Sequence, residues 1–429
     1  MLFTNLVPLW NFTSFPFCLK LIATVILSVN FLLLPFRPLK HKSGNKRLDT
    51  LKKGSSLLKI TGILSFAESI FIVLFILLSS AETPVKIFSV LMPVVTAVLM
   101  LFISMTMILA CSRQSKLKDY TKLFLLWWLP FGNIFIFRKF YKNSVKEYVF
   151  ESEKAELENS RKESEICSTK YPVLMVHGIF FRDWQLFGYW GRIPASLEKN
   201  GARVFYANQQ SAQSIENSAE EIKESILKIV RETGAEKVNI IAHSKGGLDS
   251  RYAVSRLGMD KYVATLTTVN TPHKGCDMVD FLLAKLPEKT VNSIEKRYNS
   301  IFSALGDKSP DFISGVKDLS AEKAKSYDEK MPDSPDVSYR SFMSVMKKAC
   351  SAGFPLNIGY MLIKRLNGAN DGLVWERSAE HGQYKLIDAP DVRGISHGDV
   401  IDLFRENIDG YDVREFYVRI VSELKNQGY

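Results

Sequence analysis

The sequence contains few cysteines, and acidic residues are scarce in its first third. The five cysteines are spread over 429 residues, at Cys18, Cys111, Cys167, Cys276 and Cys350. None of their spacings is typical of a zinc site or a disulfide framework, so we expect five free thiols. Residues 1–16 contain no Lys or Arg. They therefore lack the charged start of a secretory signal peptide, and we expect no cleaved signal.

The scarcity of acidic residues at one end leaves the charge unevenly distributed. Residues 1–150 carry 18 Lys and Arg against 5 Asp and Glu, whereas residues 151–429 carry 38 against 40. The formal excess of +11 therefore lies entirely in the N-terminal part. Because this excess alternates with long apolar runs, it indicates membrane topology and anionic lipid, and we expect no nucleic-acid partner.

Residues 1–140 are predicted to form a membrane region. Apolar runs lie near residues 17–36, 58–80 and 87–111, and a helix needs about 20 residues to cross the hydrocarbon. Three such runs in succession favour membrane spans over the buried helices of a soluble protein. Glu68 lies within the second run. An ionisable residue there is a candidate functional group, although a paired structural carboxylate is the preferred interpretation.

The basic loops predict the orientation of these spans. Seven Lys and Arg lie between the first two spans and four more follow the third, so both stretches are expected in the cytoplasm. The next apolar run, residues 123–137, is short and contains Pro130 and Gly132. These features favour a re-entrant segment over a fourth span, which would leave the rest of the chain in the cytoplasm. A true fourth crossing would place it outside.

Residues 171–429 are predicted to form a soluble α/β domain. A charged stretch before it, residues 141–170, is expected to be a solvated helix or a flexible linker. From residue 171, short apolar strands alternate with amphipathic stretches such as residues 214–232. The expected strands are residues 171–176, 202–207, 238–242 and 264–269. This alternation predicts a mostly parallel sheet covered by helices, with a ligand site at the carboxyl ends of the strands.

Ser244 is the candidate nucleophile. It follows one of these strands and opens a helical pattern, with Ala242 before it and Gly246 and Gly247 after it. A serine on such a strand-to-helix turn takes a strained backbone conformation that only small neighbours permit. The turn displays the hydroxyl at the start of a helix, where N–H groups and the helix dipole favour a developing negative charge.

The base is sought among only six histidines. His41 lies in the membrane loop, His177 and His273 follow strands in positions that favour structural roles, and His243 is expected to point away from Ser244. Two candidates remain. His397 lies in a tight turn before a helix-like stretch, residues 400–404, and is favoured over His381.

The acid and the oxyanion donors complete the expected site. Asp371 lies in an Asn-Asp-Gly turn and precedes His397, which gives the order Ser, Asp, His of an α/β-hydrolase. Asp388, Asp391 and Asp399 are its rivals. The backbone N–H groups of Ile179 and Lys245 are the expected oxyanion donors, because one follows the nucleophile and the other lies in the loop after the first strand.

Several separated motifs resemble the bacterial triacylglycerol lipases of the α/β-hydrolase superfamily. The resemblance is carried by residues 171–178, 188–194, 242–247, 270–277, 370–374 and 396–399, within about 260 residues of chain. It implies an α/β-hydrolase fold, with Asp371 and His397 in the acid and base motifs. It also implies that the charged segment 281–350 is a helical cap or lid, although a plain structural insertion remains an alternative.

The sequence departs from these lipases at three points. Lys245 stands where the family usually carries His or Met, and its cation is expected either beside the oxyanion, where it could select an anionic substrate, or solvated at the surface. Asp399 matches one carboxylate of the family's calcium site, but the upstream aspartate is missing and Leu403 occupies a later ligand position. We therefore expect no cofactor, and Asp399 is the one calcium candidate. The family is mostly secreted, whereas this chain is expected to be membrane-bound.

Together these patterns predict a membrane-anchored serine hydrolase acting on carboxylic esters of lipids through Ser244, His397 and Asp371. A phospholipase, thioesterase or acyltransferase on the same three residues is an alternative. An inactive hydrolase fold serving as a membrane scaffold is another, as is a transporter or sensor to which the hydrolase is attached.

Overall fold

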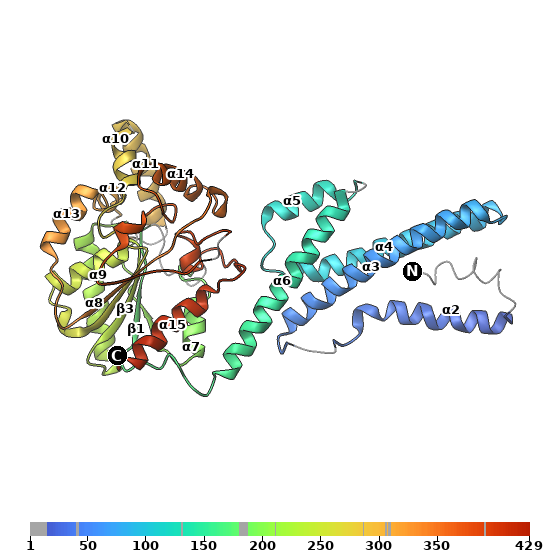
Figure 1. The fold of residues 1–429 in the computed structure, drawn as a ribbon, viewed down its shortest axis with the longest axis horizontal. Helices are drawn as coiled ribbons and strands as arrows, with labels where there is room; N and C mark the ends of the chain where they lie inside the picture. The colour runs from blue at the N-terminus through green and yellow to red at the C-terminus, as the bar shows by residue number, and fades with distance from the viewer. Residues whose placement is uncertain are drawn as a thin grey trace. The chain divides into compact units, whose positions relative to one another are not determined.

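The computed structural model divides the chain into two compact units, Met1–Asn159 and Ser160–Tyr429 (Figure 1). It describes residues 15–39, 43–129, 132–179, 188–210, 212–285, 287–304, 307, 310–389 and 392–429. His41, Pro130 and Asp391, which the sequence analysis singled out, lie outside the described residues.

The N-terminal unit is helical. Its elements are α2 (Phe17–Leu32), the 3-10 turn η2 (Leu34–Phe36), α3 (Lys46–Leu78), α4 (Thr83–Cys111), α5 (Leu117–Leu126) and α6 (Gly132–Ser160). Gly54 permits the close packing of α3 on α4, because a β-carbon there would lie 2.8 Å from the β-carbon of Met107. By length and composition, α3 and α4 could each cross a membrane. These two helices contain the apolar runs near residues 58–80 and 87–111.

The other two predicted membrane segments are shorter or interrupted. Residues 17–36 form the 16-residue helix α2 and the turn η2, so their helix is shorter than α3 and α4. Residues 123–137 do not form one continuous helix, because α5 ends at Leu126 and α6 begins at Gly132. Residues 141–160, expected as a solvated helix or part of a flexible linker, are the second half of α6. A Lys154–Glu158 ion pair, one helical turn apart, contributes to holding that half helical.

A buried carboxylate joins three elements of this unit. Glu147 on α6 accepts hydrogen bonds from Arg47 on α3 at 2.5 Å and from Ser112, directly after α4, at 2.8 Å. The backbone N–H of Arg113 also donates to it. A carboxylate removed from water is stable only when its oxygens are paired in this way. Glu68 on α3 is also buried.

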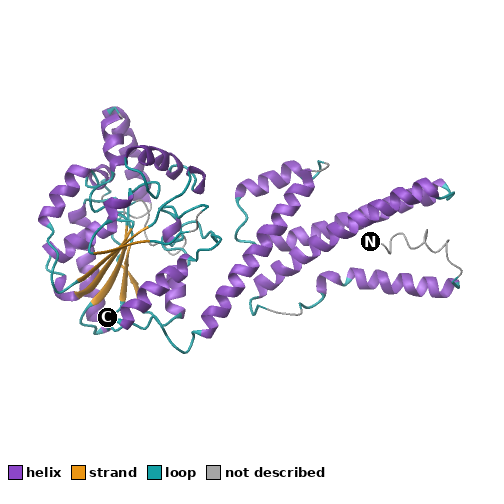
Figure 2. Ribbon diagram, viewed as in Figure 1, coloured by secondary structure: helices purple, strands orange, loops and turns teal. Residues whose placement is uncertain are grey.

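The C-terminal unit is built on a six-stranded sheet, which lies at its centre in Figure 2. The strand order is β2-β1-β3-β4-β5-β6, and every neighbouring pair is parallel. The strands are β1 (Val173–Val176), β2 (Val204–Tyr206), β3 (Val238–His243), β4 (Val263–Val269), β5 (Ser338–Met343) and β6 (Gln383–Leu386). The predicted mostly parallel α/β fold is confirmed.

Helices cover both faces of the sheet. On one face, α8 (Ile215–Thr233) and α9 (Lys245–Arg256) pack against apolar residues of β1, β3 and β4. On the other face, α7 (Ile193–Lys199) and α15 (Val413–Asn426) bury a second apolar cluster (Figure 1). The strands β1, β3 and β4 are therefore buried on both faces, which suits the wholly apolar sequence of β1. Buried polar residues interrupt the other two strands: Asn239 and His243 in β3, and three threonines in β4.

The segment between β4 and β5 is helical, as expected of a cap, but it ends earlier than predicted. It consists of α10 (Asp277–Lys285), α11 (Glu288–Ala304), α12 (Phe312–Lys317) and α13 (Ala321–Lys330). The predicted cap, residues 281–350, wrongly included β5. Residues 338–343 pair with β4 and β6 inside the sheet. Their mixture of polar and apolar residues resembles an amphipathic helix over so short a stretch.

Candidate active site

Ser244 lies in the tight turn between β3 and α9, and its φ of 54° is in the left-handed region. Such an angle costs free energy for a residue with a side chain and persists only where the surroundings enforce it. Gly246 and Gly247, just after the turn, cannot carry a side chain, because other atoms already occupy that space. A β-carbon on Gly246 would lie 2.3 Å from the carbonyl oxygen of His177, and one on Gly247 would lie 2.2 Å from Oγ1 of Thr271. The predicted elbow geometry is therefore present.

The structure brings His397 and Asp371 together. Nδ1 of His397 lies 2.6 Å from Oδ2 of Asp371, and both side chains are largely buried. Three other donors hold the same carboxylate. Leu373 and Val374 donate backbone N–H groups to Oδ1 at 2.8 Å, and Asn270 donates its amide to Oδ2 at 2.6 Å. A buried carboxylate with this many donors is fixed in position and suited to orient an imidazole.

Asn270 is a site residue that the sequence analysis did not single out as functional. It follows β4 with a φ of 49°, and its side chain also exchanges hydrogen bonds with Ser344 after β5. It therefore connects the ends of two strands to Asp371. The available signals were its place at the carboxyl end of a predicted strand and at the start of the resembling motif at residues 270–277.

His243 connects the elbow to the predicted base. Its ring packs against the ring of His397 with centroids 4.5 Å apart. Its Nδ1 lies 2.6 Å from the hydroxyl of Tyr189, which also accepts the backbone N–H of Gly178 at 3.0 Å. Burial and the neighbouring His397 ring hold the pKa of His243 well below its usual value, so this imidazole is neutral. His243 therefore points toward the loop after β1 and has a structural part in the site.

The loop after β1 passes directly against the nucleophile. A β-carbon on Gly178 would lie 2.8 Å from the β-carbon of Ser244 and 3.1 Å from the carbonyl oxygen of His243. Ile179, the next residue, is buried and packs against Phe302 on α11 and Phe312 on α12. The peptide of the predicted oxyanion donor is therefore adjacent to the elbow.

The remaining described histidines are engaged elsewhere. The ring nitrogens of His177 lie 2.7 and 2.9 Å from the carbonyl oxygens of Gly178 and Gln209. His273 is buried and contacts Thr268. His381 stacks on His273 and lies 3.1 Å from Asp333, so its carboxylate partner is not Asp371.

The rival carboxylates differ from Asp371 in their surroundings. Asp388 is exposed to solvent. Asp399 accepts hydrogen bonds from the backbone N–H and the hydroxyl of Ser396 and pairs with Arg393 at 3.1 Å.

The helix-like stretch predicted at residues 400–404 is only the 3-10 turn η6 (Asp399–Ile401). Asp402 then takes a left-handed conformation, which ends the turn.

A partly buried ion pair holds the end of the loop that carries His397. Arg192 donates to both carboxylate oxygens of Asp402, with distances of 2.8 Å from Nε and Nη2. The preceding Gly191 has a φ of 51°, and a β-carbon there would lie 2.3 Å from the carbonyl oxygen of Asp402. Residues 188–194 therefore support the site from two ends, through Tyr189 at the elbow and Arg192 at the His397 loop.

The side chain of Lys245 is not where either interpretation placed it. It is 2% exposed, and its ammonium donates to Asp249 at 2.6 Å and to Ser218 at 3.1 Å. It is therefore neither solvated nor beside the oxyanion. The ammonium lies along α9, because the carboxylate of Asp249, one turn further along the same helix, forms an ion pair with it.

The calcium site of the resembled lipases does not fit the described residues. Both oxygens of Asp399 already accept hydrogen bonds, and the Arg393 guanidinium supplies the positive charge. Within the described ranges, no three or more His, Cys, Asp or Glu side chains converge as a metal site would require. All five cysteines are free, as expected.

Comparison with known proteins supports the same fold. Residues 171–310 match the family model described as the alpha/beta hydrolase fold. Triacylglycerol lipases of Pseudarthrobacter phenanthrenivorans and Burkholderia plantarii are each 30% identical to the chain over 178 residues. These alignments cover 39% of this chain and 55% and 49% of the two lipases, so the chain spans about half the length of these curated relatives.

A solved structure extends the likeness over more of the chain. The crystal structure of Staphylococcus hyicus lipase superposes with a TM-score of 0.50 at 18% sequence identity, covering 60% of this chain and 96% of that chain. At this identity the likeness concerns the fold alone. The C-terminal unit thus has the α/β-hydrolase fold, and the N-terminal helices lie outside the matched family model.

Proposed function

We propose that the chain is a membrane-anchored serine hydrolase that cleaves carboxylic ester bonds of lipids. The observation that carries this proposal is the buried His397–Asp371 pair, whose imidazole packs against the residue directly before the strained Ser244. A serine on a strained turn, a base and an orienting carboxylate are the parts that acyl transfer requires. The similarity to triacylglycerol lipases supports an ester of a lipid as the substrate.

In the proposed mechanism, Oγ of Ser244 attacks the acyl carbonyl carbon while Nε2 of His397 takes the hydroxyl proton. Asp371 holds the Nδ1–H side of the ring and stabilises the imidazolium that forms. The backbone N–H groups of Ile179 and Lys245 bind the oxyanion. His397 then returns the proton to the leaving alcohol, and an acyl-enzyme remains. Water, activated by the same imidazole, releases the fatty acid.

The N-terminal unit is proposed to hold the hydrolase at a membrane, where its substrate is concentrated. The lengths and apolar compositions of α3 and α4 support this role. The basic residues between positions 37 and 53, which include the start of α3, and those after α4 favour a cytoplasmic location for the hydrolase unit. Protease added to intact spheroplasts should therefore leave residues near position 160 uncut, and cleavage from outside would contradict this placement.

Substrate competition separates the proposed lipase from its alternatives. The full-length protein in detergent should release fatty acid from a triacylglycerol emulsion, and Ser244→Ala should release none. Faster turnover of a phospholipid or an acyl thioester would favour a phospholipase or a thioesterase on the same three residues. Acyl transfer to an added alcohol in place of water would favour an acyltransferase. If no ester is turned over by the folded protein, the scaffold alternative is favoured.

A further inference from the structure

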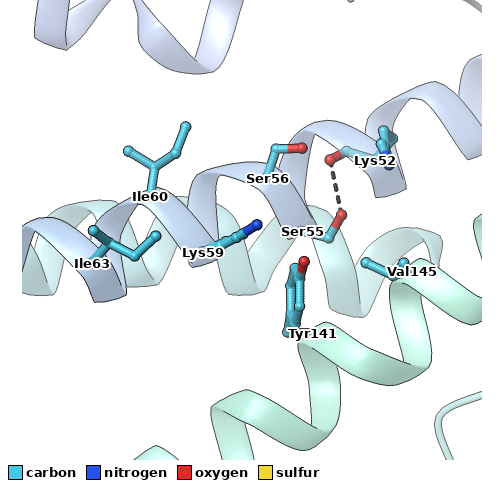
Figure 3. Close-up of a pocket in the computed structure, with 8 residues that line it drawn as sticks. All are labelled: Lys52, Ser55, Ser56, Lys59, Ile60, Ile63, Tyr141 and Val145. Carbon is cyan, nitrogen blue, oxygen red and sulfur yellow. Dashed lines mark hydrogen bonds between the residues drawn. The ribbon is translucent and has the colours of Figure 1, made fainter.

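A cavity of about 320 Å³ lies in the N-terminal unit, between α3 and α6 (Figure 3). One face of α3 supplies most of its wall, because the contributing residues are spaced by three or four positions. The residues that line the cavity are Lys52, Ser55, Ser56, Lys59, Ile60 and Ile63 from α3 and Tyr141 and Val145 from α6. No carboxylate is among these eight residues, so the cavity has a positive character.

Four polar groups of the cavity are available to a ligand, whereas the Ser55 hydroxyl donates to the carbonyl oxygen of Lys52 at 2.9 Å. In the described part of the chain, the ammonium of Lys59 and the hydroxyls of Ser56 and Tyr141 form no hydrogen bond to the protein. Lys52 is held over the ring of Tyr148, 4.8 Å from its centroid, and forms no ion pair with a described carboxylate. Two ammonium groups and two hydroxyls are donors suited to phosphate oxygens.

The cavity also lies at the change from charged to apolar sequence along α3. Lys52 and Lys59 belong to the basic beginning of the helix, whereas Ile60 and Ile63 begin its apolar run. In a membrane-spanning helix, this change marks the level of the lipid headgroups. A bound phospholipid would meet the lysines with its phosphate and the isoleucines with its acyl chains.

We propose that this cavity binds the phosphate headgroup of an anionic phospholipid, separately from the Ser244 site. Such a lipid would fix α3 against α6 at the membrane surface. This inference rests on the proposed membrane anchoring. Free inorganic phosphate shares the headgroup chemistry, but it has no acyl chains to contact the two isoleucines.

The test is lipid retention by the full-length protein in detergent, measured by native mass spectrometry. Phosphatidic acid should stay bound in preference to phosphatidylcholine with the same acyl chains. Removing both lysines in Lys52→Gln/Lys59→Gln should weaken phosphatidic acid binding about thirtyfold. The matched control Lys46→Gln/Lys53→Gln removes the same charge from the same helix outside the cavity and should weaken binding much less. Tyr141→Phe, which changes no charge, should also weaken it.

Each arm has a result that overturns the inference. Equal losses in the two double variants would mean that a diffuse positive field, not this cavity, holds the lipid. Displacement of the lipid by inorganic phosphate at matched concentration would assign the site to free phosphate. Carbonate extraction of membranes tests the anchoring separately. A chain that is released by carbonate contradicts the proposed anchoring, whereas a chain that resists extraction but retains no phosphatidic acid overturns this inference alone.

Discussion

The ammonium of Lys245 lies 2.6 Å from Oδ1 of Asp249, one turn along α9, and both side chains are buried. The backbone of Lys245 therefore forms part of the turn at Ser244, while its side chain forms a buried ion pair that stabilises α9. The pair faces Ser218 and Glu216 on α8, and Asp318 and Tyr327 of the segment between β4 and β5. This polar cluster connects the residue after Ser244 to the segment between β4 and β5, so it is expected to position the backbone N–H of Lys245, the proposed oxyanion donor.

Removing Asp249 should lower the free energy of unfolding more than removing Lys245. Asp249→Ala leaves a buried ammonium without its carboxylate and should lower the free energy of unfolding by about 3 kcal/mol. Lys245→Met should cost less, because burial raises the pKa of Asp249 to about 7 and the remaining carboxyl can take up a proton. Urea unfolding of the two variants at pH 7 measures both costs. A larger cost for Lys245→Met would contradict this account of the pair.

The same carboxyl predicts a pH dependence of stability. Burial is the largest cause of the raised pKa of Asp249, and the Lys245 ammonium opposes it only in part. Because the folded protein then holds this proton where the unfolded chain has lost it, the free energy of unfolding should fall as pH rises from about 4 to about 7. The pKa of neighbouring Asp318 is also raised by burial and adds a slope of the same sign. Asp249→Asn should flatten the fall, and an unchanged slope would exclude Asp249 as its source.

Two histidine–aspartate pairs in the C-terminal unit allow a matched test of the base. Asp371→Asn should lower kcat by about 10⁴-fold, because an amide no longer holds the His397 tautomer that accepts the serine proton. Asp333→Asn alters the partner of His381 and should leave kcat nearly unchanged. Ester hydrolysis by both variants, each checked for folding by circular dichroism, measures the difference. Comparable losses of kcat in the two variants would make His381 a candidate for the base again.

Tyr189 should support the site through its hydroxyl. Tyr189→Phe leaves the buried N–H of Gly178 and Nδ1 of His243 without their shared partner, at a cost of about 1–3 kcal/mol in stability. It should also lower kcat, since the loop carrying Ile179 loses its anchor to the elbow. The control is Tyr417→Phe. The Tyr417 hydroxyl is buried without a hydrogen-bond partner among the described residues, so its removal should leave stability nearly unchanged or improve it. The tyrosine account fails if the two variants behave alike.

The sequence predicted the parts of the fold that carry local signals. The strands β1, β3 and β4 are short and rich in apolar or β-branched residues, and each precedes a turn with small or polar residues, so both their existence and the loops after them could be predicted. Two strands were missed. The edge strand β6 is mostly exposed and has no apolar run, and β5 mixes polar and apolar residues.

Side-chain contacts across the sheet could not be predicted in the same way. The hydrogen bond between Tyr189 and His243 joins residues 54 positions apart, and the sequence around neither residue predicts this contact. Likewise, the ammonium of Lys245 interacts electrostatically with Asp318, which follows α12, and no periodicity in the sequence predicts that the two are close. The order of Ser244, Asp371 and His397 was available from turn chemistry, but the support that orients them was not.

Labelling with a fluorophosphonate probe tests the central claim most directly. The probe reacts covalently with an activated serine, so the full-length protein in detergent should be labelled once, at Ser244, and Ser244→Ala should not be labelled. His397→Ala should lose the label while retaining its fold, because the serine then has no base. Absence of a Ser244-dependent adduct in the folded wild-type protein would contradict the assignment of this elbow as the active site of a serine hydrolase.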